Sequence, residues 1–212
     1  IGIGALRTEP ALMTELSAQP SDSLVALRGR SRFVRSMHNL SLPAQPDDRP
    51  WLRAGGVYVI TGGLGGLALE IAEHLARSDK VRFALLARSE LPPEEECDDV
   101  LRLVPAESLG AQRIRRIREI RKLGAKVAVF KCDIVDARQV EHTLAAIRSE
   151  LGPIAGVIHA AGVMDDAPIE NKSFESMSRV LLPKIAGALN LDQLIDEPLD
   201  FFLLFSSVSS IL

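Results

Sequence analysis

Four glycines between positions 62 and 66 form the stretch of this sequence that is best suited to a chemical task. An apolar run at 57–60 precedes them, and apolar residues at helical spacing follow. Strand, glycine turn and helix in this order are typical of a loop that holds a dinucleotide pyrophosphate, because glycine lets the backbone approach the phosphates at the helix N-terminus. Glycine turns also join strands to helices without binding a ligand, but this context favours binding. The candidate loop residues are Thr61, Gly62, Gly63, Leu64, Gly65 and Gly66.

An arginine follows the next apolar run, about 20 residues beyond the glycine loop. Arg88 and Ser89 end the run at 81–87. Folds that bind NAD place an acidic residue here for the ribose 2′-hydroxyl, whereas arginine suits a 2′-phosphate. The sequence therefore predicts NADP rather than NAD, the alternative being a surface arginine at a strand end.

Three later apolar runs also end in polar or small residues. Asp133 and Ile134 follow the run at 126–130, and that carboxylate is suited to accept a hydrogen bond from adenine or to begin a turn. His159 closes the run at 154–159 with no visible partner and is interpreted as structural, the alternative being a general base. The small residues behind it would let the backbone lie against a ribose: Ala160, Ala161 and Gly162. Serines at 206–210 follow the last apolar run.

The elements that position these residues alternate along the chain. Strands are predicted at 57–60, 81–87, 126–130, 154–159 and 201–205, and helices at 66–78, 107–123, 136–151 and 173–195. This alternation predicts an α/β fold, a doubly wound parallel sheet that binds ligands at the carboxyl ends of its strands. The polar stretch 89–105, with its acidic run, is expected to be a solvated loop.

The first 54 residues differ in character from the rest. A short helix is expected at 11–16 and two short strands around a turn at 28–30, with four arginines that are interpreted as a solvated face. Proline and aspartate at 41–54 mark a linker, and Trp51 is expected to pack where that linker meets the next domain.

Composition limits the classes of protein. The 212 residues are 47% hydrophobic and carry a net charge of −3, which implies no general affinity for nucleic acid or an anionic membrane. No apolar run approaches the ~20 residues of a membrane span. Two cysteines are too few for a disulfide framework or a zinc site, so free thiols in the cytoplasm are expected. The sequence starts without Met or a signal peptide, and we expect it to be cut from a longer chain.

Together, these motifs resemble the short-chain dehydrogenase/reductase family and, more narrowly, the ketoreductase domains of modular polyketide synthases. The resemblance covers residues 55–212, and residues 1–40 are similar to the end of the structural subdomain that precedes the catalytic half. The segments that carry it are ITGGLGGLALEIAEHLA, LLARSE, IHAAGVMDD, VLLPKIAGALNL and FFLLFSSVSS.

The resemblance implies NADPH-dependent reduction of a β-ketoacyl thioester on a phosphopantetheine-linked acyl carrier protein, within a module of other synthase domains. Ser207 matches the serine that hydrogen-bonds the substrate carbonyl, with Ser206, Ser209 and Ser210 as weaker candidates. Lys184 matches the lysine that lowers the pKa of a catalytic tyrosine. Asp166 ends a Met-Asp-Asp run that is similar to a signature of D-hydroxy (B-type) products.

One feature of the family has no counterpart in the sequence. The resemblance places the catalytic tyrosine about a dozen residues after the serine and an asparagine shortly behind it, both beyond Leu212. Tyr58, in the first strand, is the only tyrosine. We therefore expect a fold that is incomplete at the C-terminus and a fragment that is inactive by itself.

Other functions stay open at this point. One alternative is a free-standing short-chain reductase, and another is a non-catalytic NADP-binding structural domain. Nucleic-acid binding by the arginine-rich helix at 107–123 has little support at this net charge.

Overall fold

The computed structural model describes residues 9–19, 22–29, 31–41, 52–77 and 80–207. The chain divides into two compact units, Ile1–Asp47 and Asp48–Leu212. Arg30, Trp51 and most of the predicted linker lie outside the described residues, as do Ser209 and Ser210.

The first unit contains the predicted short helix and two strands. These are α1 (Glu9–Ser17), β1 (Val25–Arg28) and β2 (Ser31–Val34), and the two strands pair antiparallel. Arg32 on β2 forms ion pairs with Glu15 at 2.7 Å and Asp22 at 2.9 Å. Because Arg32 binds carboxylates of its own unit, these contacts support an internal role for this arginine.

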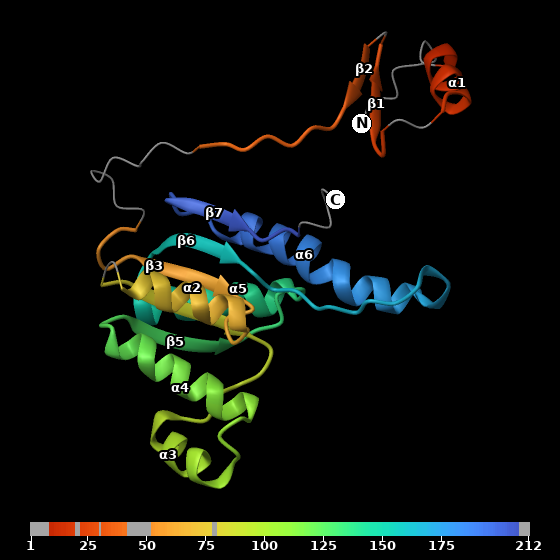
Figure 1. Ribbon diagram of the computed structural model, residues 1–212. Coiled ribbons are helices and arrows are strands. Elements are labelled where there is room, and N and C mark those ends of the chain that lie inside the picture. The colour runs from red at the N-terminus through yellow and green to blue at the C-terminus, as the bar shows by residue number, and fades with distance from the viewer. Residues whose placement is uncertain (1–8, 20–21, 30, 42–51, 78–79, 208–212) are drawn as a thin grey trace. The chain divides into compact units, whose positions relative to one another are not determined.

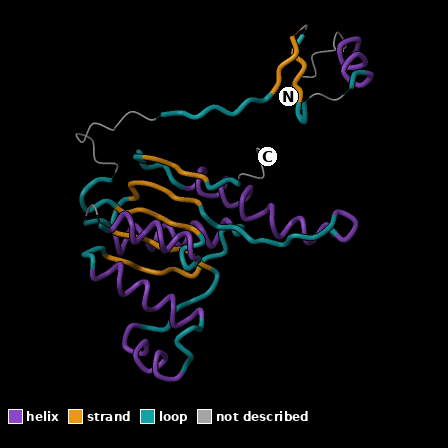
Figure 2. Tube along the Cα trace, in the orientation of Figure 1, coloured by secondary structure: helices purple, strands orange, loops and turns teal. Residues whose placement is uncertain are grey.

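The second unit is a five-stranded sheet with the order β5-β4-β3-β6-β7 (Figures 1 and 2). Every neighbouring pair is parallel. The strands are β3 (Val57–Thr61), β4 (Arg82–Ala87), β5 (Lys126–Lys131), β6 (Ile154–His159) and β7 (Phe201–Leu204). The helices are α2 (Gly66–Ala76), α3 (Glu94–Leu103), α4 (Leu109–Lys122), α5 (Ala137–Leu151) and α6 (Phe174–Leu194), with a 3₁₀ turn η1 at Ile169–Asn171. The predicted doubly wound parallel sheet is confirmed.

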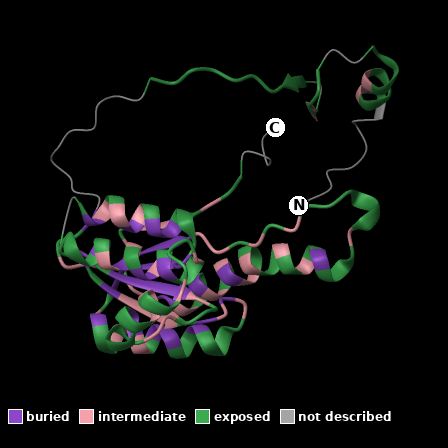
Figure 3. Ribbon diagram, turned by 60° about the horizontal axis from the view of Figure 1, so that its bottom comes forward, coloured by how far each residue is buried: buried purple, intermediate pink, exposed green. Residues whose placement is uncertain are grey.

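Helices cover both faces of this sheet. Successive side chains of a strand point to opposite faces, so each central strand contributes apolar side chains to both helix layers. Tyr58 and Ile60 of β3 pack on the side of α2 and α4. Val57 and Val59 of the same strand pack on the side of α5 and α6. In Figure 3 the central strands β3, β4 and β6 are therefore largely buried, while the outer faces of the helices are exposed. No helix in the described ranges is long and apolar enough to cross a membrane.

The prediction of a solvated loop at 89–105 is wrong, because helix α3 lies inside that segment. Pro93 stands at its start, and Glu94, Glu95 and Glu96 fill its first turn. Proline is well placed at a helix N-terminus, and carboxylates in the first turn are stabilised by the helix dipole. The acidic run is thus a helix start.

Arginines of α4 bind the acidic residues of neighbouring helices. Arg116 lies 2.8 Å from both Glu70 and Glu73 of α2. Arg118 forms an ion pair with Asp98 of α3 at 2.6 Å, and Arg121 pairs with Glu94. These contacts are internal to the fold, and they argue against α4 as a nucleic-acid surface.

Tyr58 forms a hydrogen-bond network at the end of the sheet where the strands begin. Its hydroxyl donates to Asp200 at 2.9 Å and accepts from the backbone N–H of Arg53 at 2.6 Å. The Arg53 guanidinium in turn lies 2.7 Å from Asp200, and the Tyr58 ring stacks on Phe201. Burial raises the pKa of Tyr58 to about 12, so the hydroxyl is protonated near neutral pH.

We predict that Tyr58→Phe lowers the free energy of unfolding by about 1–3 kcal/mol, because it leaves the Arg53 N–H without its acceptor while keeping the ring stack. Denaturant unfolding of wild type and variant measures the difference. Equal unfolding midpoints would contradict a structural role for this hydroxyl.

Candidate functional site

A cavity of about 1230 Å³ lies where β3, β4, β5 and β6 end. It is lined by most of the residues that the sequence placed at a cofactor site: Thr61, Gly62, Leu64, Gly65, Arg88, Ser89, Asp133, Ile134, Ala161 and Gly162. Three other predicted residues, Gly63, Gly66 and Ala160, do not line it. The carboxyl edge of the sheet thus gathers residues from four strands.

Two loop glycines have no room for a side chain. Gly62 has a φ of +65°, and a Cβ there would lie 2.9 Å from the Ala160 carbonyl oxygen. A Cβ on Gly63 would lie 2.6 Å from the Leu85 Cβ, and the Gly63 N–H donates to the Leu86 carbonyl at 2.9 Å. Gly63 therefore ties the loop to β4 instead of facing the cavity.

The first turn of α2 has no side-chain cap. Gly65 is the N-cap residue, and Gly66 begins the helix with open space around its Cα. The first N–H groups of a helix need acceptors from outside the helix, and an anion is a suitable one. Together with the bare loop and the size of the cavity, these donors fit a dinucleotide pyrophosphate.

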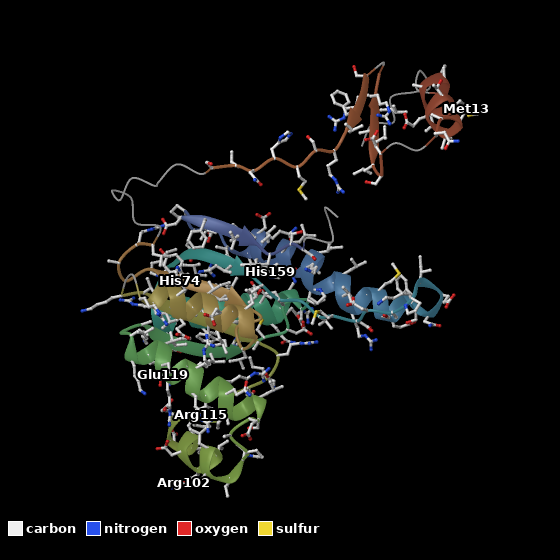
Figure 4. The ribbon with its side chains drawn as sticks, viewed as in Figure 1. Met13, His74, Arg102, Arg115, Glu119 and His159 are labelled. Atoms are coloured by element: carbon white, nitrogen blue, oxygen red, sulfur yellow. The ribbon has the colours of Figure 1, made fainter. Side chains whose placement is uncertain are left out.

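His159 joins two strands to helix α6, and Figure 4 labels it at the end of β6. Its Nδ1 lies 2.7 Å from the Thr61 hydroxyl, and its Nε2 lies 3.0 Å from the carbonyl oxygen of Pro183. A carbonyl only accepts, so Nε2 carries the proton and Nδ1 accepts from Thr61. The Thr61 hydroxyl accepts in turn from the Ala161 N–H at 3.1 Å. These partners support the structural interpretation of His159.

Helix α6 approaches the sheet closely at this point. A Cβ on Gly187 would lie 3.0 Å from the His159 Cε1 and 2.9 Å from the Ile134 Cγ2. One turn further, the Asn190 side chain donates to the carbonyls of Ile134 and Val135 at 2.9 and 3.1 Å. Gly187 thus permits the contact, and the hydrogen bonds fix the position of α6 along the strand ends.

The two predicted catalytic residues lie near this junction but outside the cavity lining. Lys184 follows Pro183 on α6, and its Cε lies 4.0 Å from the position of a Cβ on Gly162. Ser207 follows β7, whose extension is held beside β6 by a bond from the Phe205 N–H to the His159 carbonyl at 3.1 Å. Both side chains are exposed.

The acidic residues near the cavity have distinct environments. Asp133 lines it and also begins the expected turn, because its carboxylate accepts from the Val135 N–H at 3.1 Å. Asp166 is exposed and does not line the cavity, whereas its neighbour Asp165 does. Hydrogen bonds from Ser176 and then Arg179 hold the pKa of Asp165 below its ordinary value. Asp165 therefore anchors the loop after β6 to α6.

Sequence reasoning missed Arg113, which lines the cavity from α4. Its Nε donates to the carbonyl of Leu64 in the glycine loop at 3.0 Å. The helical pattern placed this arginine on the solvent side of α4, and only the crossing of the helix past the loop brings it to the cavity.

A parallel sheet of this order, with a glycine turn after the central strand β3, is typical of dinucleotide-binding folds, which include the short-chain dehydrogenase/reductase class. Residues 56–212 match the family described as "KR domain". The chain therefore belongs to the KR, or ketoreductase, domain family of polyketide synthases, and its members are oxidoreductases that bind a nicotinamide cofactor.

Individual relatives agree with this family. The chain is 39% identical over 183 residues to 6-methylsalicylic acid synthase of Penicillium patulum, with 85% of the chain covered. It spans 10% of the length of that synthase.

Two solved structures share the fold. A ketoreductase domain from the bacillaene assembly line superposes with a TM-score of 0.70 at 31% identity, covering 95% of this chain and 44% of that one. A structure of A-type ketoreductases from a modular polyketide synthase gives 0.71 at 28% identity, covering 98% and 40%.

The buried His159 predicts a pH dependence of stability. Burial, the largest cause, lowers the pKa of this imidazole below its ordinary value of 6.5. Below pH 6.5 the imidazole binds a proton in the unfolded chain but stays neutral in the folded protein. The free energy of unfolding therefore falls as the pH falls below 6.5, and it has its full value above that pH. We expect His159→Gln to reduce the difference in unfolding free energy between about pH 7.5 and about pH 5.5.

Denaturant unfolding at both pH values measures this effect. His74→Gln is the matched control, since it replaces an exposed histidine of α2 that takes no part in the junction between Thr61, His159 and Pro183. An unaltered pH dependence in His159→Gln would show that another group titrates.

Proposed function

We propose that this chain is the cofactor-binding part of a ketoreductase that uses NADPH to reduce a β-ketoacyl thioester to a 3-hydroxyacyl thioester in polyketide synthesis. The observation that carries the proposal is the set of strand-end residues around one cavity, in a chain that belongs to the KR family. The substrate is held on the phosphopantetheine of an acyl carrier protein, which supplies it from the same synthase.

The cofactor residues follow from the position of each strand end. The N–H groups at the start of α2 and the loop at 61–66 would hold the pyrophosphate. Arg88 and Ser89 would hold the 2′-phosphate of NADPH, Asp133 and Ile134 the adenine, and the backbone at 160–162 the nicotinamide ribose. When bound, the nicotinamide supplies the hydride.

Ser207 and Lys184 act on the substrate side of that cofactor. The Ser207 hydroxyl donates a hydrogen bond to the carbonyl oxygen, where negative charge develops during reduction. The Lys184 side chain reaches toward Gly162, with its Cε 4.0 Å from the position of a Cβ there, and its positive charge would lower the pKa of the group that protonates the oxygen.

The proton donor is a tyrosine outside residues 1–212. Tyr58 is unsuited to the role, because it is buried near the amino end of β3 and its hydroxyl is bound to Asp200. Residues 1–212 alone would accordingly turn over no β-ketoacyl thioester. The intact protein, meaning the longer chain that contains these residues and the tyrosine, would catalyse the reaction.

The product configuration and the surroundings are further parts of the proposal. Asp166, in the loop after β6, supports a D-hydroxy (B-type) product by its position in the Met-Asp-Asp run. The partners are the acyl carrier protein and the other domains of a synthase module in the cytoplasm.

A non-catalytic NADP-binding domain is the second candidate, since a cofactor cavity by itself does not require turnover.

Serine variants of the intact protein test the proposal. Ser207→Ala should lower kcat/KM for a β-ketoacyl thioester by about a hundredfold or more, because it removes a hydrogen bond to the developing oxyanion. Ser206→Ala is the matched control and should change kcat/KM by no more than a few-fold. NADPH affinity, measured by fluorescence titration, should be the same in both variants.

Two other results would contradict the proposal. Full activity in Ser207→Ala would remove this serine from the reaction. Absence of turnover in the wild type, with NADPH still bound, would favour the non-catalytic domain.

A further inference from the structure

Arg113 is fixed at the rim of the cavity by the glycine loop. Its Nε donates to the Leu64 carbonyl at 3.0 Å, and this bond uses only one of the nitrogens of the guanidinium. The preceding loop residue, Gly63, is bound to the Leu86 carbonyl of β4 at 2.9 Å. The loop therefore joins Arg113 to the end of β4, where Arg88 and Ser89 line the same cavity.

This arginine differs from its neighbours on α4. Arg116, Arg118 and Arg121 each bind a carboxylate of α2 or α3. Arg115 bonds to the Ala106 carbonyl at 2.7 Å and does not line the cavity. In the described part of the chain, no carboxylate lies in ion-pair distance of Arg113, so its charge is not neutralised by the protein.

Two of the arginines that line the cavity have no ion pair among the described residues. Arg179 is paired with Asp165 at 2.8 Å. Arg88 and Arg113 are the remaining lining cations, and neither has an ion pair among the described residues. A phosphate monoester carries close to two negative charges at neutral pH and is recognised best by the forked donors of arginine.

We infer that Arg113 is a second determinant of the 2′-phosphate and binds it from α4 opposite Arg88, so that the preference for NADPH comes from an arginine pair. The inference rests on the proposed function, because it needs a dinucleotide with its adenosine end at β4. The hydrogen bond from the Arg113 Nε to the Leu64 carbonyl fits this role, because it orients the guanidinium and leaves the two terminal nitrogens available for the phosphate.

Calorimetric titration of the intact protein with NADPH and with NADH tests the inference. Wild type should bind NADPH more tightly than NADH. Arg113→Gln should weaken NADPH by about tenfold or more, which is the loss of one charge-assisted contact, and should change NADH by less than about twofold. Arg115→Gln is the matched control and should bind both like wild type.

Each other outcome has a separate meaning. Equal weakening of both cofactors would show that Arg113 only supports the loop, and unchanged NADPH binding would remove it from the site; either overturns the inference. A wild type that does not prefer NADPH would overturn the proposed cofactor itself. Should Arg113→Gln fail to fold, Arg113→Lys serves in its place, with a smaller loss for NADPH alone expected because lysine keeps the charge without the fork.

Discussion

The hydrogen bonds of His159 are the constraint on which the rest of the site depends. This buried imidazole binds the Thr61 hydroxyl and the Pro183 carbonyl, and so joins β3, β6 and α6 at one point. The contact is possible only because Gly187 brings no side chain between helix and strand. A neutral ring is required, since one nitrogen must donate and the other accept. This junction places Lys184, which follows Pro183, beside the end of β6.

The amino ends and the carboxyl ends of the strands have different roles. At the end where the strands begin, Tyr58, Arg53 and Asp200 bind one another. At the carboxyl ends, the strands are followed by glycines, small residues and Arg88, which has no ion pair among the described residues, around a cavity of about 1230 Å³. Stability and binding are thus separated along the strands, as expected for a doubly wound fold. Residues from four strands and two helices meet at one edge, although some are about a hundred positions apart in the sequence.

Much of this arrangement could be predicted from local patterns. Strand and helix periodicity predicted the sheet, the glycine spacing between a strand and a helix predicted the loop, and the position of the strand ends predicted Arg88 and Asp133. Helix α3 was missed because its acidic run was interpreted only as a solvated loop, although a proline followed by glutamates is also typical of a helix start. Arg113 was missed for another reason: its role depends on how α4 crosses the loop, which no local pattern encodes. The partners of His159 were also invisible, because Thr61 and Pro183 are distant in sequence.

A crystal structure of the intact protein with NADP⁺ tests the central claim most directly, namely that this carboxyl edge holds the hydride donor. We expect the pyrophosphate over the first turn of α2, the 2′-phosphate beside Arg88, and the nicotinamide on the Gly162 and Lys184 side of β6. A dinucleotide bound outside this cavity, or one bound in it with its adenosine beside Lys184, would contradict the account.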